Sequence, residues 1–139
     1  SLGLVGSEMC IRDRLEMKDC EWQAGAFGMT GLETALPIII ETMVNTGRMD
    51  WADVARVMST VPAQIGRVKS QGQGLVVGAP AHVTLVDATV RVTVDPAKQW
   101  TRSTNCPFRG MELPGQVRYT IYNGVPTVVG ATPIAKEDR

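Results

Sequence analysis

The sequence predicts a chain in which helices come first and a small antiparallel β unit follows. Apolar residues recur at three- and four-residue spacing between residues 32 and 58, as on the buried face of a helix. From residue 82 onward, short β-branched runs are separated by glycine and proline. Short helices with no sheet of their own, beside a few strands that form only a partial sandwich, do not make a complete domain. We therefore expect the 139 residues to be part of a larger fold.

A first helix is expected to begin near Thr30. Thr30 and Glu33 fit a capping box, in which each side chain binds a backbone N–H of the first turn. Pro37 should bend or restart this helix because proline lacks an N–H donor, and Gly47 should end it. Its apolar stripe consists of Leu32, Ala35, Leu36, Ile39, Ile40, Met43 and Val44.

A second helix is expected to begin at Asp50, which is a favourable N-cap residue. Asp53 would lie near the positive end of the helix dipole. Pro62 should open a third, short helical turn that Gly66 closes. The apolar stripe of the second helix consists of Trp51, Val54, Ala55 and Met58.

Four β-branched runs predict the strands of the second half. The dipeptide Asn123-Gly124 separates the last two runs and predicts a tight hairpin, since both residues tolerate positive φ. Alternation in two of the runs indicates one buried and one wet face. Residues 100–115 have no clear period and are expected to form a long connection. The runs are residues 82–87, 90–95, 117–122 and 125–129.

Composition excludes several classes of function. The net charge is zero, so nothing indicates binding to nucleic acid or to an acidic membrane surface. The longest apolar runs are too short to span a bilayer. An odd number of cysteines, three, argues for a reducing compartment, and we expect a cytoplasmic protein. With one histidine, His82, and no paired cysteines, we expect no metal ligands in this chain.

Three stretches, taken in order, resemble one family, the type I dihydroorotases of the amidohydrolase superfamily. Residues 25–37, GAFGMTGLETALP, are similar to the segment that follows the last barrel strand of these enzymes. Residues 74–87, GLVVGAPAHVTLVD, resemble the strand that returns the chain to a β-sandwich. Residues 103–128, STNCPFRGMELPGQVRYTIYNGVPTV, look like the C-terminal signature of the family. The resemblance covers about residues 15–129.

This resemblance implies an α/β parent fold, of which the chain would be a C-terminal fragment. Residues 15–29 would form the active-site loop after the last strand of a TIM-like (β/α)8 barrel, and residues 30–68 its C-terminal helices. Residues 69–139 would supply strands and the closing hairpin of a small β-sandwich. Residues 1–14 contain LVGSEMCIRDR, which looks like a translated sequencing adapter and stands where the family has an Asp-His-Ala-Pro-His run.

The implied activity is that of dihydroorotase, a zinc-dependent cyclic amide hydrolase that interconverts N-carbamoyl-L-aspartate and dihydroorotate in pyrimidine biosynthesis. Zinc would activate a hydroxide in the parent. The fragment lacks the family's ligands and catalytic aspartate, so we expect it to be inactive alone. Two alternatives stay open: another cyclic amidohydrolase, such as an allantoinase or hydantoinase, or a non-catalytic subunit that binds aspartate transcarbamoylase. The resemblance is also compatible with a homodimer.

The family match assigns one functional element to this chain, the pair Phe27-Gly28, whose backbone would contact the substrate. Glycine suits this role because it allows a ligand to approach the main chain closely. Cys106 is expected to be a buried thiol, and Asn105 and Glu112 to hold their loop by hydrogen bonds. His82 is expected to have a structural role at the start of a strand.

Overall fold

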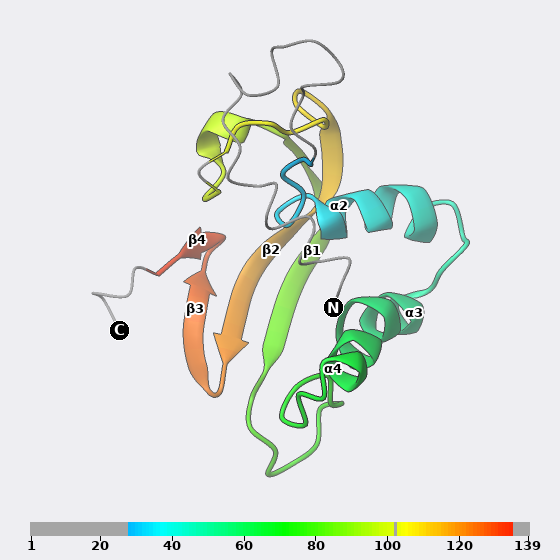
Figure 1. Cartoon of the computed structure of the whole chain (residues 1–139), viewed down its shortest axis with the longest axis vertical. Coiled ribbons are helices and arrows are strands. Elements are labelled where there is room, and N and C mark those ends of the chain that lie inside the picture. The colour runs from blue at the N-terminus through cyan, green and yellow to red at the C-terminus, as the bar shows by residue number, and fades with distance from the viewer. Residues whose placement is uncertain (1–27, 102, 135–139) are drawn as a thin grey trace.

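The computed structural model describes residues 28–101 and 103–134. A four-stranded antiparallel sheet forms the centre, with the strands in the order β1-β2-β3-β4. The helices lie on the β1 side of the sheet, and β4 forms the opposite edge (Figure 1). Helices therefore precede the sheet in the chain, as the sequence predicts.

Among the described residues, the helical region begins with α2 (Ala35–Ile39), which continues directly into the π-helical segment η2 (Ile40–Val44). Pro37 lies in the first turn of α2, where backbone N–H groups have no intrahelical acceptor. The loss of a hydrogen bond expected at this proline therefore does not arise. Gly47 follows the helix with φ 73°, and its N–H donates to the carbonyl of Val44, in keeping with its predicted role as the stop.

The second helical segment consists of α3 (Trp51–Ala55), the π-helical η3 (Arg56–Thr60) and α4 (Val61–Ile65), which follow one another without a break. Asp50 is the N-cap, and it forms a reciprocal capping box with Asp53. This confirms the predicted start. Gly66 caps the end of α4, also as predicted.

The capping box predicted for Thr30 and Glu33 is wrong. Helix α2 begins only at Ala35, and its N-cap, Thr34, makes no side-chain cap bond. The side chains of Thr30 and Glu33 instead bind the segment 100–105. Capping chemistry was available locally, but partners distant in the sequence competed for the same groups.

The sheet contains β1 (Val83–Thr93), β2 (Glu112–Tyr122), β3 (Val125–Val129) and β4 (Thr132–Pro133). Strand β1 unites two of the predicted runs into one strand, with a shift of register between Asp87 and Arg91. The Oδ1 atom of Asp87 accepts hydrogen bonds from the N–H and Oγ1 of Thr89, at 3.2 and 2.8 Å. This local turn makes a bulge, which bends a strand without ending it.

Strand β2 begins earlier than predicted, because residues 112–115 belong to it and not to the connection. Pro114 pairs with Arg91 of β1, whereas β3 pairs only with the far end of β2, from Thr120 to Tyr122. A proline is tolerated there because its missing N–H faces no ladder partner. The connection between β1 and β2 also contains a short 3-10 helix, η4 (Pro96–Lys98).

The predicted hairpin is present between β2 and β3. Tyr122 pairs with Val125, and Asn123 and Gly124 adopt φ values of 50° and 79°. Both residues therefore have the positive φ that a two-residue hairpin of this kind requires. A further turn at Gly130-Ala131, with φ values of 57° and 69°, joins β3 to β4.

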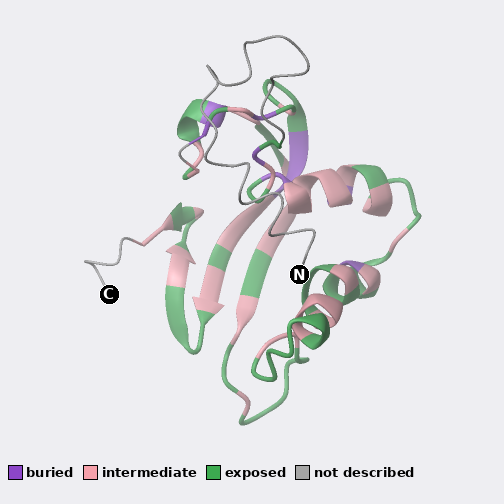
Figure 2. Ribbon diagram, in the orientation of Figure 1, coloured by how far each residue is buried: buried purple, intermediate pink, exposed green. Residues whose placement is uncertain are grey.

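The core is small and lies where α2 and η2 meet β2 (Figure 2). Ile40 exposes 1% of its surface and Leu113 exposes 2%. The buried face expected for the strands is confined to residues 113–115 of β2, so the alternation prediction is wrong for most of the sheet. Many large apolar side chains instead remain exposed, among them Leu32, Trp51, Met58, Leu75, Val77, Leu85, Tyr119 and Val129.

Candidate functional site

The predicted substrate-contacting pair lies at the edge of the described residues. Phe27 falls outside them, and Gly28 is the first residue within them. Gly28 has φ 103°, a conformation that L residues with a side chain rarely adopt. Its carbonyl accepts a hydrogen bond of 2.8 Å from the Nδ2 atom of Asn105. The backbone at this position is therefore held by a residue 77 positions further along the chain.

Asn105 binds the same segment a second time through its own backbone. Its carbonyl oxygen accepts hydrogen bonds from the N–H of Thr30 at 2.9 Å and from the Oγ1 of Thr30 at 3.1 Å. Thr30 exposes 3% of its surface, so these bonds are shielded from water. One residue of the β1–β2 connection thus fixes both ends of the segment 28–30.

The loop around Asn105 is partly buried and internally bonded. Ser103 exposes 7% of its surface and Cys106 exposes 8%. The N–H of Cys106 donates to the carbonyl of Thr104 at 2.8 Å. The predictions of a buried Cys106 thiol and of an Asn105 that holds this loop are both confirmed. Glu112 is bonded through its backbone carbonyl, which accepts a hydrogen bond of 2.7 Å from Arg91 Nη2.

Glu33 joins the start of the helical region to the same connection. Its two carboxylate oxygens accept hydrogen bonds from the N–H groups of Trp100 at 3.1 Å and Thr101 at 3.0 Å. Because both oxygens accept hydrogen bonds from backbone donors, Glu33 has a structural role in which it ties residues 100 and 101 to the start of the helical region. A groove of about 510 Å³ lies beside it, lined by Thr30, Gly31, Leu32, Glu33, Gln99, Trp100, Thr101 and Pro133.

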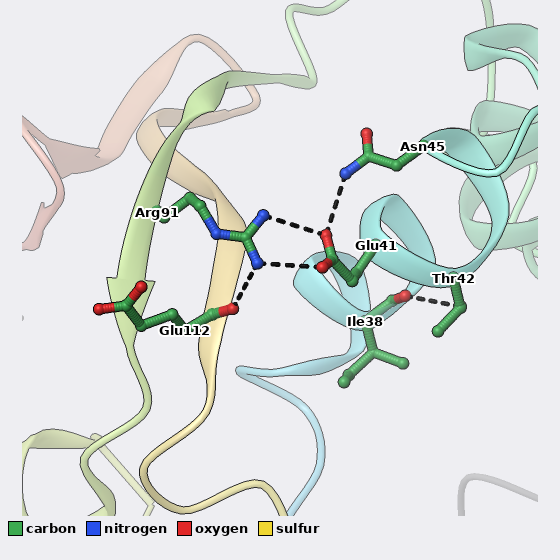
Figure 3. A network of polar contacts seen from close by, with 6 residues as sticks. All are labelled: Ile38, Glu41, Thr42, Asn45, Arg91 and Glu112. Carbon is green, nitrogen blue, oxygen red and sulfur yellow. Dashed lines mark hydrogen bonds and ion pairs between the residues drawn. The ribbon is translucent and has the colours of Figure 1, made fainter.

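A second long-range contact fastens the helix to the sheet. Glu41 of η2 and Arg91 of β1 form a bidentate pair, with nitrogen–oxygen distances of 3.0 and 3.2 Å (Figure 3). Figure 3 also shows Asn45 donating to the Glu41 carboxylate, at 3.0 Å. The hydrogen bond from Arg91 holds the pKa of the Glu41 carboxyl below its usual range, against the opposing effect of desolvation. The sequence offered no signal for this pair, which is separated by 50 residues.

His82 lies just before β1 and contacts the hairpin between β2 and β3. Its Nδ1 atom lies 3.2 Å from the N–H of Asn123 and 3.2 Å from the Nε2 of Gln71. Its ring packs edge-on against Tyr122, with centroids 5.1 Å apart. These contacts fit the structural role predicted for His82.

A metal site in a protein usually combines three or more His, Cys, Asp or Glu side chains. Within residues 28–101 and 103–134, no three of these side chains come together closely enough. None of the helices in this part of the chain is long and apolar enough to cross a membrane.

Comparisons with known proteins place these features in a family context. No protein-family model matches the chain. The chain is 54% identical over 114 residues to the dihydroorotase of Streptomyces coelicolor, and the matched region covers 82% of this chain and 27% of that enzyme. It is 42% identical over 115 residues to the dihydroorotase of Leifsonia xyli, and this matched region covers 83% of this chain and 26% of that enzyme. The chain thus spans about a quarter of the length of these relatives.

The fold also matches solved structures. A D-hydantoinase (dihydropyrimidinase) from Thermus sp. superposes on 91% of this chain with a TM-score of 0.79. The match covers 28% of that chain at 21% sequence identity, and so shows a shared fold.

Proposed function

The chain belongs to the dihydroorotase family, and on this premise we propose that it forms part of an enzyme that interconverts N-carbamoyl-L-aspartate and dihydroorotate. The observation that carries this proposal is the 54% identity to the Streptomyces coelicolor dihydroorotase over 82% of the chain. Pyrimidine biosynthesis in the cytoplasm is the setting that follows from that activity.

We place the chain at the C-terminal end of the parent enzyme, with residues 15–29 as the active-site loop. Segments α2 to α4 would then be the last helices of a TIM-like barrel, and β1 to β4 would belong to a small β-sandwich. The exposed apolar residues of the helices support this placement, since Trp51 of α3 exposes 48% of its surface and Ile65 of α4 exposes 63%. Apolar surface of this extent marks an interface with other parts of a protein.

In the complete enzyme, the backbone at Phe27 and Gly28 would contact the substrate. The positive φ of Gly28 and its missing side chain support this role, because they let a ligand approach the main chain. The described residues do not provide a set of metal ligands. The zinc implied by the family would be held by residues elsewhere in the parent, where it would supply an activated hydroxide.

Two alternatives predict different outcomes. A hydantoinase or allantoinase is supported by the hydantoinase fold match, but that match has 21% identity and concerns the fold alone. A non-catalytic subunit that binds aspartate transcarbamoylase would share the dihydroorotase sequence without the activity. The identities of 54% and 42% to enzymes named dihydroorotase favour the first proposal.

The experiment uses a chimera in which residues 15–139 of this chain replace the matching part of the Streptomyces coelicolor enzyme. We expect the purified chimera to hydrolyse dihydroorotate and to cyclise N-carbamoyl-L-aspartate, and to leave hydantoin and allantoin unchanged. The chain alone should show no turnover. Preferential hydrolysis of hydantoin would contradict the proposal, as would an inactive but folded chimera.

Size-exclusion chromatography of the chimera, with and without aspartate transcarbamoylase, tests the expected homodimer and complex.

A further inference from the structure

We propose that Asn105 is a positioning residue for substrate binding, because its side-chain amide fixes the carbonyl of Gly28. This inference rests on the proposed function, in which the backbone at Gly28 contacts the substrate. The observation behind it is a hydrogen bond of 2.8 Å between Asn105 Nδ2 and the Gly28 oxygen. Its length is typical of a well-formed amide–carbonyl bond.

Asn105 contacts the segment 28–30 through two separate groups, its backbone carbonyl and its side-chain amide. Its backbone carbonyl accepts both hydrogen bonds from Thr30, and this anchors the segment just before α2. Its side-chain amide makes the separate bond to Gly28. A substitution at residue 105 removes the second bond and leaves the first in place. The orientation of the Gly28 peptide can therefore be tested without detaching the segment.

The Gly28 peptide needs such a partner because its backbone conformation is not self-determined. A glycine populates positive and negative φ about equally, so its value of 103° has to be selected by contacts. Substrate bound through main-chain groups requires those groups to be oriented in advance, since small displacements of binding groups cost large factors in rate or affinity. The Asn105 amide contributes to this selection from a loop in which the flanking residues Ser103 and Cys106 are buried.

The test is Asn105→Ala in the chimera, with Asn105→Asp as a second variant. Aspartate keeps the size of the side chain but presents a carboxylate, which has no N–H to donate to Gly28. We expect both variants to raise the KM for dihydroorotate by about tenfold, the factor that corresponds to one lost hydrogen bond. We expect kcat to change by less than about threefold.

Asn45→Ala is the matched control, because the Asn45 amide also donates to an oxygen, that of Glu41, but within η2 and its C-terminal end. It should leave KM unchanged. A purely structural role for Asn105 would lower the melting temperature and the fraction of active enzyme, and so reduce apparent kcat without raising KM. That result, or an unchanged KM in the Asp variant, overturns the inference. An inactive unsubstituted chimera would overturn the proposed function and this inference together, whereas an active one with a KM insensitive to residue 105 overturns the inference alone.

Discussion

Ile40 occupies the space into which a side chain on Gly115 would project. A Cβ atom placed on Gly115 would collide with Cδ1 of Ile40, the most deeply buried apolar residue of the described chain. Gly115 lies within β2 and has φ 93°. This contact brings η2 against the sheet at the one place where the strand surface is buried.

We predict that Gly115→Ala destabilises the chimera strongly. Strain at positive φ contributes about 1–2 kcal/mol, and overpacking against Ile40 adds about 1–3 kcal/mol. The measurement is the free energy of unfolding in denaturant. Gly110→Ala is the control, because Gly110 has φ 77° but open space around it, so only the first effect applies.

Combining Gly115→Ala with Ile40→Val tests the contact itself. Valine lacks the Cδ1 atom that the new methyl group would meet, so the double variant should be more stable than the sum of the two changes predicts. Simple additivity of the two free-energy changes would contradict the assigned contact.

Arg91→Gln should make the thermal stability of the chimera less sensitive to acid. The folded-state pKa of Glu41 is lowered chiefly by its hydrogen bond from Arg91. The stabilisation that the Glu41–Arg91 pair provides is therefore complete above the ordinary pKa of a glutamate, and it is lost as pH falls through the lowered folded-state pKa. The difference in melting temperature between the chimera and Arg91→Gln should be constant near neutrality and shrink in acid.

Glu41→Gln provides the control for this pH series, because it removes the titrating carboxyl. In this background, the effect of Arg91→Gln on the melting temperature should no longer depend on pH. A gap between the chimera and Arg91→Gln that stays equal from neutral to strongly acidic solution would show that the pair does not respond to protonation of Glu41.

Glu33→Gln should loosen the 100–101 segment. Glutamine has one carbonyl oxygen in place of two carboxylate oxygens, so one of the N–H groups of Trp100 and Thr101 loses its acceptor. We expect a loss of about 1 kcal/mol and faster hydrogen exchange at these two amides, measured by mass spectrometry. A change confined to the amides of residues 30–33 would instead favour the capping box.

Local features of the fold were predictable from the sequence, and features that join distant segments were not. The Asp50 cap and the Asn123-Gly124 hairpin depend on neighbouring residues, and both predictions are confirmed. The sequence predicts two runs separated at residues 88–89 where the structure has the single strand β1, because a bulge and a strand end share the same composition. Glu33 was assigned to the nearest backbone donor, although Trp100 and Thr101 bind it.

The candidate site shows the same division. The resemblance to dihydroorotases identified Gly28, and the sequence suggested that Asn105 makes hydrogen bonds. The bond that links the two crosses 77 residues and became visible only with the fold. No periodicity connects a loop between two strands to a segment that precedes the first helix.

The sheet order has a consequence for handling the chain by itself. Within the described residues, β1 has a strand neighbour on one side only, so alternate residues along this 11-residue strand direct their backbone donors and acceptors away from the sheet. Such an edge is a template for intermolecular strand addition. The pairing of β1 with β2 shifts register between Leu85 and Val86 and again between Asp87 and Arg91. Self-association should therefore begin on the regular stretches of the strand and should increase with protein concentration.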